Sequence, residues 1–253
     1  MTAERHRIGL IVPSSNTVVE DVWTRFAPSM PRLGCHFARI SVTAIGQDAA
    51  TAAQFERDKL LAAADLLAEL GPDRIIWAGT AAAWIGFDHD RALCAQITAR
   101  TGVPATTSLL ELNAALAARG ASRIALITPY RADTEAAIIA NYEASGIAVV
   151  ARRRLDLTVN TDFAAVTPET LARLAEEASA SQADAILFVC TNLRGADAMA
   201  CVSSETREKI IDSVVVTYAC ASSRGEACPL DAVGSGDGDV IAIDGSERGP
   251  WRQ

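Results

Sequence analysis

A single cysteine breaks the match between two otherwise similar apolar segments. These segments are Ile75-Ile76-Trp77-Ala78-Gly79-Thr80 and Ile186-Leu187-Phe188-Val189-Cys190-Thr191, and each ends in a small residue followed by threonine. Short apolar runs of this kind predict buried parallel strands, which would bring equivalent turns to one place. Because Cys190 stands where the other segment has Gly79, a site built from both turns would carry a thiol on one side only.

Two more predicted strands place polar turns beside these. Ile8–Val12 runs into Pro13–Thr17, and Arg123–Thr128 runs into Pro129–Asp133. Each half of the chain therefore reads as strand, polar turn, helices, buried strand and small-residue turn, which predicts a duplicated α/β unit with parallel sheets. Ligands of such sheets bind beyond the carboxyl ends of the strands, so all four turns are expected to face one cleft.

Helical periodicity and stop signals predict the connecting elements. Ser108-Leu109-Leu110-Glu111 has the spacing of a capping box, with Ser108 as the cap. The apolar run Val214–Tyr218 favours a strand. The helices are expected at residues 51–70, 90–101, 108–119, 134–145 and 168–182.

These elements predict two domains and a tail. The first domain takes residues 1–107 together with 213–220, the second takes 108–212, and the hinge lies near 104–108. Residues 221–253 are rich in Gly, Ser and Asp and lack helical periodicity, so we expect an atypical, disordered tail there.

Composition excludes several classes of function. The chain has 253 residues, half of them hydrophobic, and a formal net charge of −8, which argues against nucleic acid or an anionic membrane as a partner. No apolar run approaches the roughly 18 residues that would span a bilayer, and no leader-like segment opens the chain, so we expect a cytoplasmic protein. The six cysteines and three histidines have no metal-ligand spacing, and no metal is expected.

Three motifs carry a resemblance to a known family. They are Pro13-Ser14-Ser15-Asn16-Thr17, Tyr130 and Cys190-Thr191-Asn192-Leu193-Arg194. Over roughly residues 6–213 the chain resembles the Asp/Glu racemase superfamily, in particular its branch of maleate isomerases and arylmalonate decarboxylases. The resemblance implies two pseudo-symmetric domains, each a four-stranded parallel sheet flanked by helices. It also implies no cofactor and a small dicarboxylate substrate held between the domains, and it leaves homo-oligomer formation open.

The chain departs from the racemising members of that superfamily at Gly79. Racemisation needs an acid/base group on each face of a carbon atom, and glycine supplies none. In maleate isomerases the cysteine of the first half is the one expected to attack the double bond. Gly79-Thr80 resembles the decarboxylases, whereas the motifs at Ser14 and Cys190 resemble the isomerases. Decarboxylation of a malonate-type diacid is the first hypothesis, maleate isomerisation the second, and a non-catalytic carboxylate-binding protein the third.

The predicted site joins one acid to a set of donors. Cys190 is the candidate proton donor, Gly79 marks the missing second cysteine, and the helix after Cys190 is expected to lower its pKa. Asn16 could instead cap a helix, and Thr80 and Thr191 could satisfy local backbone groups. The candidate substrate-binding residues are Ser15, Asn16, Thr80, Ala81, Tyr130, Thr191 and Asn192.

The end of the chain departs from the resemblance. Members of the family usually finish with a strand, a small polar turn and an amphipathic helix that closes the first domain, and after Thr217 the sequence shows nothing similar. One hypothesis is that a changed reading frame produced residues from about 217 onward. The covering helix would then be missing, and apolar surface would be exposed.

Overall fold

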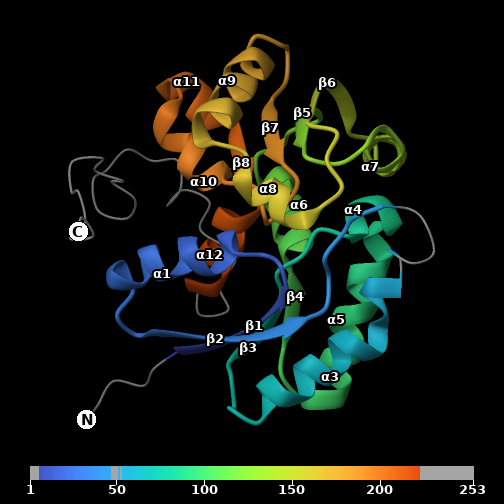
Figure 1. Ribbon diagram of the computed structural model, residues 1–253, viewed down its shortest axis with the longest axis vertical. Helices are drawn as coiled ribbons and strands as arrows, with labels where there is room; N and C mark the ends of the chain where they lie inside the picture. Colours follow the sequence, from blue (N-terminus) through green and yellow to red (C-terminus); the bar gives the residue numbers. More distant parts are fainter. Residues whose placement is uncertain (1–5, 47–50, 52, 223–253) are drawn as a thin grey trace.

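Two separate parallel sheets form the framework of the protein. The computed structural model describes residues 6–46, 51 and 53–222, and Figure 1 shows the sheets toward opposite ends of the long axis. The first sheet has the order β2-β1-β3-β4 and the second β6-β5-β7-β8. Their strands are β1 (His6–Pro13), β2 (Leu33–Ile40), β3 (Arg74–Trp77), β4 (Ala105–Thr107), β5 (Arg123–Thr128), β6 (Ala148–Arg154), β7 (Ala185–Phe188) and β8 (Ile210–Asp212).

The central strands of the two sheets pair in the same way. Ile11 of β1 pairs with Trp77 of β3, and Ile127 of β5 pairs with Phe188 of β7, in both cases in parallel. The segments after β3 and β7 therefore leave equivalent points of the two sheets. The predicted fold class, α/β with two four-stranded parallel sheets flanked by helices, is confirmed.

Helices cover both sheets, mostly where periodicity predicted them. The predicted helix 51–70 is the main exception, because Glu56 has an extended ψ of 130° and separates η2 from α3. The helices, labelled as in Figure 1, are α1 (Val18–Phe26), η1 (Ala27–Ser29), η2 (Ala53–Phe55), α3 (Arg57–Ala68), α4 (Ala82–Ile85), α5 (Phe87–Thr101), α6 (Ser108–Ala118), α7 (Ala132–Ala144), α8 (Asn160–Ala165), α9 (Pro168–Ser179), α10 (Gly195–Ala198), η3 (Met199–Cys201), α11 (Ser204–Lys209) and α12 (Ser213–Ser222).

The start of α6 differs from the predicted capping box by one residue. Thr107 is the cap, and its hydroxyl accepts a hydrogen bond from the Leu110 amide at 3.1 Å. Glu111 accepts a hydrogen bond from the Thr106 hydroxyl rather than from a cap amide. The prediction that Ser108 caps the helix is therefore wrong, because the hydroxyl at the end of β4 already takes that amide.

The predicted strand at Val214–Tyr218 is also wrong, because these residues belong to α12. Asp212 accepts hydrogen bonds from the amides of Val214 and Val215, both at 2.9 Å, and so begins the helix. Tyr218 then contacts the Trp23 ring of α1 with centroids 5.2 Å apart, and Figure 1 shows α1 and α12 side by side. A helix does cover this face of the first sheet.

The predicted tail begins two residues too early, since residues 221 and 222 end α12. Residues 223–253 lie outside the described residues. The reading-frame hypothesis rests mainly on that segment and stays a hypothesis.

Two apolar clusters hold the fold together. The smaller one lies between the first sheet and the helices α1 and α12, and includes Leu10, Trp23 and Ile76. The larger one continues through both halves and includes Trp77 and Phe188. The two sheets therefore share a buried core. Within the part of the chain that the structure describes, no helix has the length and apolarity needed to cross a membrane.

Candidate active site

Three strand ends are tied together by one short series of hydrogen bonds. The Asn16 amide, after β1, donates to the Thr191 hydroxyl at 3.1 Å. That hydroxyl, after β7, donates to the carbonyl of Ala78, directly after β3, at 3.0 Å. Asn16 and Thr191 are both buried. The turns predicted to meet from the two halves of the chain do so here.

The fourth turn brings Tyr130 to the thiol. Its hydroxyl lies 3.2 Å from the Thr80 hydroxyl, and its nearness to the Cys190 thiol lowers the pKa of that thiol. Only 2–4 % of Tyr130, Thr80 and Cys190 is exposed to solvent. A phenol is thus held between a hydroxyl of the first half and a thiol of the second.

Aromatic rings fix the position of Tyr130. The Trp84 ring of α4 lies 5.0 Å from the tyrosine ring and the Phe163 ring of α8 lies 5.7 Å from it, both in edge-on arrangements. Such contacts are favourable for aromatic pairs and restrict the ring. One side of the site is therefore apolar, while the hydroxyl end of Tyr130 faces polar groups.

The thiol of Cys190 is protonated at neutral pH. Burial raises its pKa to about 11, although hydrogen bonds from Tyr130 and from the amides of Asn192 and Leu193 act in the opposite direction. The expectation that the following helix leaves the pKa lowered is therefore wrong. Helix α10 has only four residues and begins at Gly195, and desolvation outweighs the donors near the sulfur.

The Asn192 side chain joins the two halves of the chain. Its side-chain oxygen accepts from the Thr17 amide at 3.1 Å and from the Val18 amide at 3.4 Å, at the start of α1. Its side-chain nitrogen donates to the Asn160 carbonyl at 2.6 Å and to the Ser15 carbonyl at 3.4 Å. Every polar atom of this buried side chain thus has a partner within the protein.

Ser15 and Asn160 continue this network. The Ser15 hydroxyl donates to the Val42 carbonyl at 2.5 Å and accepts from the Asn160 amide at 2.8 Å. Sequence reasoning missed Asn160 and Phe163, because residues 155–166 showed no periodicity that predicted an element. The available signal was weak: a short Asn-Thr-Asp-Phe run directly after a polar segment.

Asn16 supports the first turn of α1 and also contacts the second half of the chain. Its side-chain oxygen accepts from the Val19 amide at 3.1 Å, which is helix capping, while its nitrogen contacts Thr191. Arg39 of β2 supports the same turn by donating to the carbonyls of Ser14 and Asn16, each at 3.0 Å. The turn is therefore held rigidly on both sides.

Gly79, two residues after the end of β3, lies against the indole ring of Trp77. A Cβ atom added there would lie 2.7 Å from Nε1 of Trp77 and closer still to two carbons of the indole ring. Trp77 is 1 % exposed. The next residues, Thr80 and Ala81, are buried and lead into α4.

A buried carboxyl group near Cys190 was not expected from the sequence. Asp212 ends β8 beside Phe188 of β7, and its second oxygen is buried without a hydrogen-bond partner. Burial raises the pKa of Asp212 to about 7, against the effect of the Val214 and Val215 amides. Its charge, when present, raises the pKa of Cys190.

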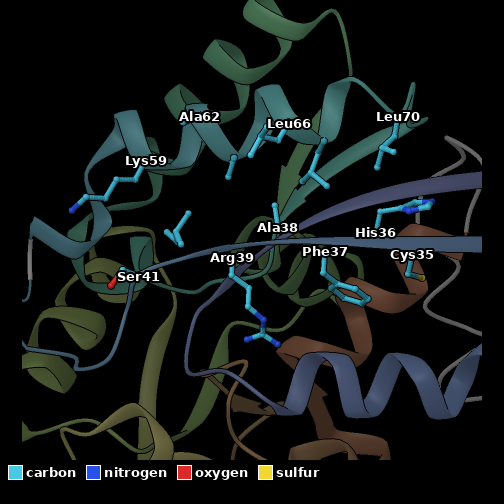
Figure 2. A pocket seen from close by; sticks show the side chains of 13 residues that line it. Cys35, His36, Phe37, Ala38, Arg39, Ser41, Lys59, Ala62, Leu66 and Leu70 are labelled. Atoms are coloured by element: carbon cyan, nitrogen blue, oxygen red, sulfur yellow. The ribbon is translucent and has the colours of Figure 1, made fainter.

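Two further features take no part in the hydrogen bonds around Cys190. Arg194, part of the motif at Cys190, pairs with Asp21 at 3.3 Å across the two halves. A surface groove lies between α3 and the edge strand β2, with Lys59, Ala62 and Leu66 on the helix side, and none of the predicted site residues lines it (Figure 2). Among the described residues, no group of three or more His, Cys, Asp or Glu side chains could hold a metal ion.

The sequence profile of the family described as arylmalonate decarboxylase matches residues 8–237. The chain belongs to this family. A maleate isomerase of Nocardia farcinica is 27% identical over 192 residues, which cover 73% of this chain and 75% of the relative. An arylmalonate decarboxylase of Bordetella bronchiseptica is 28% identical over 196 residues, covering 76% and 79%. The family membership and both relatives agree with the resemblance seen in the sequence.

A solved structure shares the fold of this family member. A Nocardia farcinica maleate cis-trans isomerase, crystallised as a cysteine-to-serine mutant with a covalently bound succinylcysteine intermediate, superposes with a TM-score of 0.73. It is 23% identical, and the match covers 85% of this chain and 90% of the other. The relatives thus include both a decarboxylase and an isomerase, and the chain is a member of an enzyme family that contains both activities.

Proposed function

We propose that this protein is a cofactor-independent decarboxylase of a small malonate-type diacid, with Cys190 as its proton donor. The observation that carries the proposal is that only one of the two equivalent turns has a thiol. Cys190 follows β7, while the equivalent position after β3 is Gly79. A buried thiol whose pKa is raised to about 11 is an acid rather than a nucleophile at neutral pH.

In this mechanism the substrate is held through one carboxylate. The donors are the Thr80 and Tyr130 hydroxyls and the amides of the turn at Thr80 and Ala81, while the Thr191 hydroxyl, which donates to the Ala78 carbonyl, holds this turn in position. The second carboxylate lies against apolar side chains such as Trp84, where poor solvation of its charge favours loss of CO₂. The carbon–carbon bond breaks, and its electron pair passes into an enediolate on the first carboxylate. Oxyanion donors of this kind typically contribute ~3 kcal/mol each.

Protonation completes the reaction. The Cys190 thiol gives its proton to the α-carbon, and the resulting thiolate is held by the amides of Asn192 and Leu193. The thiolate then recovers a proton from solvent. Because one acid stands on one face of the planar intermediate, a single enantiomer of the monoacid is expected.

Maleate cis-trans isomerisation is the second candidate function. It is favoured by the relative named maleate isomerase and by the contact between Asn16 and Thr191, two residues of the isomerase-like motifs. Against it, an attack on the double bond would have to come from Cys190 alone, and this thiol is protonated at neutral pH. A carboxylate-binding protein without turnover is the third candidate.

Proton NMR of the protein in D₂O with phenylmalonate, methylmalonate and maleate separates these functions. The proteins to compare are the wild type, Cys190→Ala and, as a matched control, Cys201→Ala, whose cysteine is exposed on η3. Deuterated monoacid from a malonate, absent only with Cys190→Ala, is the expected result. Fumarate formed from maleate would support the isomerase instead. No turnover of any of the three compounds would support the binding protein.

A further inference from the structure

The strands β3 and β7 end in different aromatic residues, Trp77 and Phe188. Trp77 precedes Gly79 by two residues, and Phe188 precedes Cys190 by two residues, at equivalent points of the two sheets. At the same spacing, Phe188 is followed by a cysteine and Trp77 by a glycine.

The indole ring of Trp77 is larger than the phenyl ring of Phe188, and it fills the space that a side chain at position 79 would need. A Cβ atom at Gly79 would overlap Cε2 and Cζ2 of Trp77 and lie 2.7 Å from Nε1, closer than side-chain atoms pack. Phe188, at the equivalent point of the second sheet, has no second ring, and a cysteine stands two residues after it. Trp77 lies in the core cluster that runs through both halves, so its ring can move only if its neighbours move as well.

We propose that Trp77 is a specificity-determining residue that keeps the first half of the site free of an acid/base side chain. Trp77 thereby limits the enzyme to proton delivery from the Cys190 side. This inference rests on the proposed decarboxylase function. A thiol introduced at position 79 alone cannot settle into place, but one introduced together with a smaller ring at position 77 can.

The expected gain of function is racemisation of the monoacid product. The introduced thiolate would remove the α-proton from one face, and the Cys190 thiol would deliver a proton to the other face, leaving one thiol and one thiolate. Solvent exchange of the two sulfurs then resets the site. No atom is gained or lost except by exchange of the α-hydrogen with solvent.

A double-mutant cycle tests the steric part of the proposal. The variants are Gly79→Ala, Gly79→Cys, Trp77→Phe and the two combinations of Trp77→Phe with a substitution at Gly79. Trp77→Phe is the matched control, because it copies the ring that accompanies Cys190. Gly79→Ala and Gly79→Cys should each lower the Tm by roughly 5 °C or more, as expected for overpacking. Each combined variant should melt above the corresponding single substitution at Gly79. A Gly79→Cys protein with the wild-type Tm would overturn the proposal.

Exchange of the α-proton tests the specificity part. In D₂O with an enantiopure monoacid, Trp77→Phe with Gly79→Cys should incorporate deuterium and racemise the acid at least tenfold faster than either single variant. If the combined variant regains Tm but does not racemise the acid faster, Trp77 is not a specificity residue. Full racemisation by Gly79→Cys alone would also overturn that role. Decarboxylation by the wild type is measured in parallel with the exchange of the α-proton. Failure of that assay counts against the proposed function, while the Tm cycle still tests the steric conflict.

Discussion

Replacing Asn192 by alanine tests whether this residue joins the two halves of the protein. Its side chain makes two short hydrogen bonds, to the Thr17 amide at 3.1 Å and the Asn160 carbonyl at 2.6 Å. It also makes two longer ones, both at 3.4 Å. Losing a net hydrogen bond costs about 1 kcal/mol, and leaving a buried partner unsatisfied raises this to about 1–3 kcal/mol. Counting only the two short bonds, we expect Asn192→Ala to lower the free energy of unfolding by about 3 kcal/mol.

The assay is urea denaturation, followed by tryptophan fluorescence and circular dichroism. A loss of this size would be a large share of the roughly 5–15 kcal/mol that stabilises a typical protein. Asn113→Ala is the matched control, because the partly buried Asn113 accepts one hydrogen bond, from Tyr142 at 2.9 Å. It should cost no more than about 1 kcal/mol. Equal losses in the two variants would refute the role of Asn192 in joining the two halves.

Three further predictions concern the buried titratable groups. Tyr130→Phe removes the hydroxyl between Thr80 and Cys190, so decarboxylation should slow by roughly 10- to 100-fold with the Tm little changed, and an unchanged rate would exclude that hydroxyl from the reaction. Because the pKa of Cys190 is raised to about 11, its alkylation by iodoacetamide, followed by peptide mass spectrometry, should accelerate about tenfold per pH unit from neutral pH upward, and a plateau below pH 9 would contradict this assignment. The pKa of Asp212 is raised to about 7, so its folded form holds a proton that the unfolded form loses near pH 4. The wild type should therefore lose stability relative to Asp212→Asn as pH rises from about 4 to 7 in urea titrations, and a constant difference would show that the carboxyl does not titrate there.

Much of the framework could be predicted from local patterns. The runs at Ile75 and Ile186 are apolar on both faces, and only strands buried between helices tolerate that, so parallel sheets followed directly. The abrupt change to small and hydroxyl residues marked where the strands end. Val214–Tyr218 misled the same reasoning, because a β-branched run is compatible with a buried helix when a residue such as Asp212 caps its first turn.

The sequence by itself determined the duplicated α/β framework, the turns that supply the site and the presence of one thiol where Gly79 leaves its counterpart empty. Those features depend on residue type and on spacing along the chain. Only the tertiary structure decided that Tyr130 contacts Thr80 of the other half, that Asn192 spans the halves, and that Trp77 occupies the space beside Gly79. These contacts join residues from different strands or depend on the packing of one ring, and burial, which sets the pKa of the thiol, depends on the whole surrounding core.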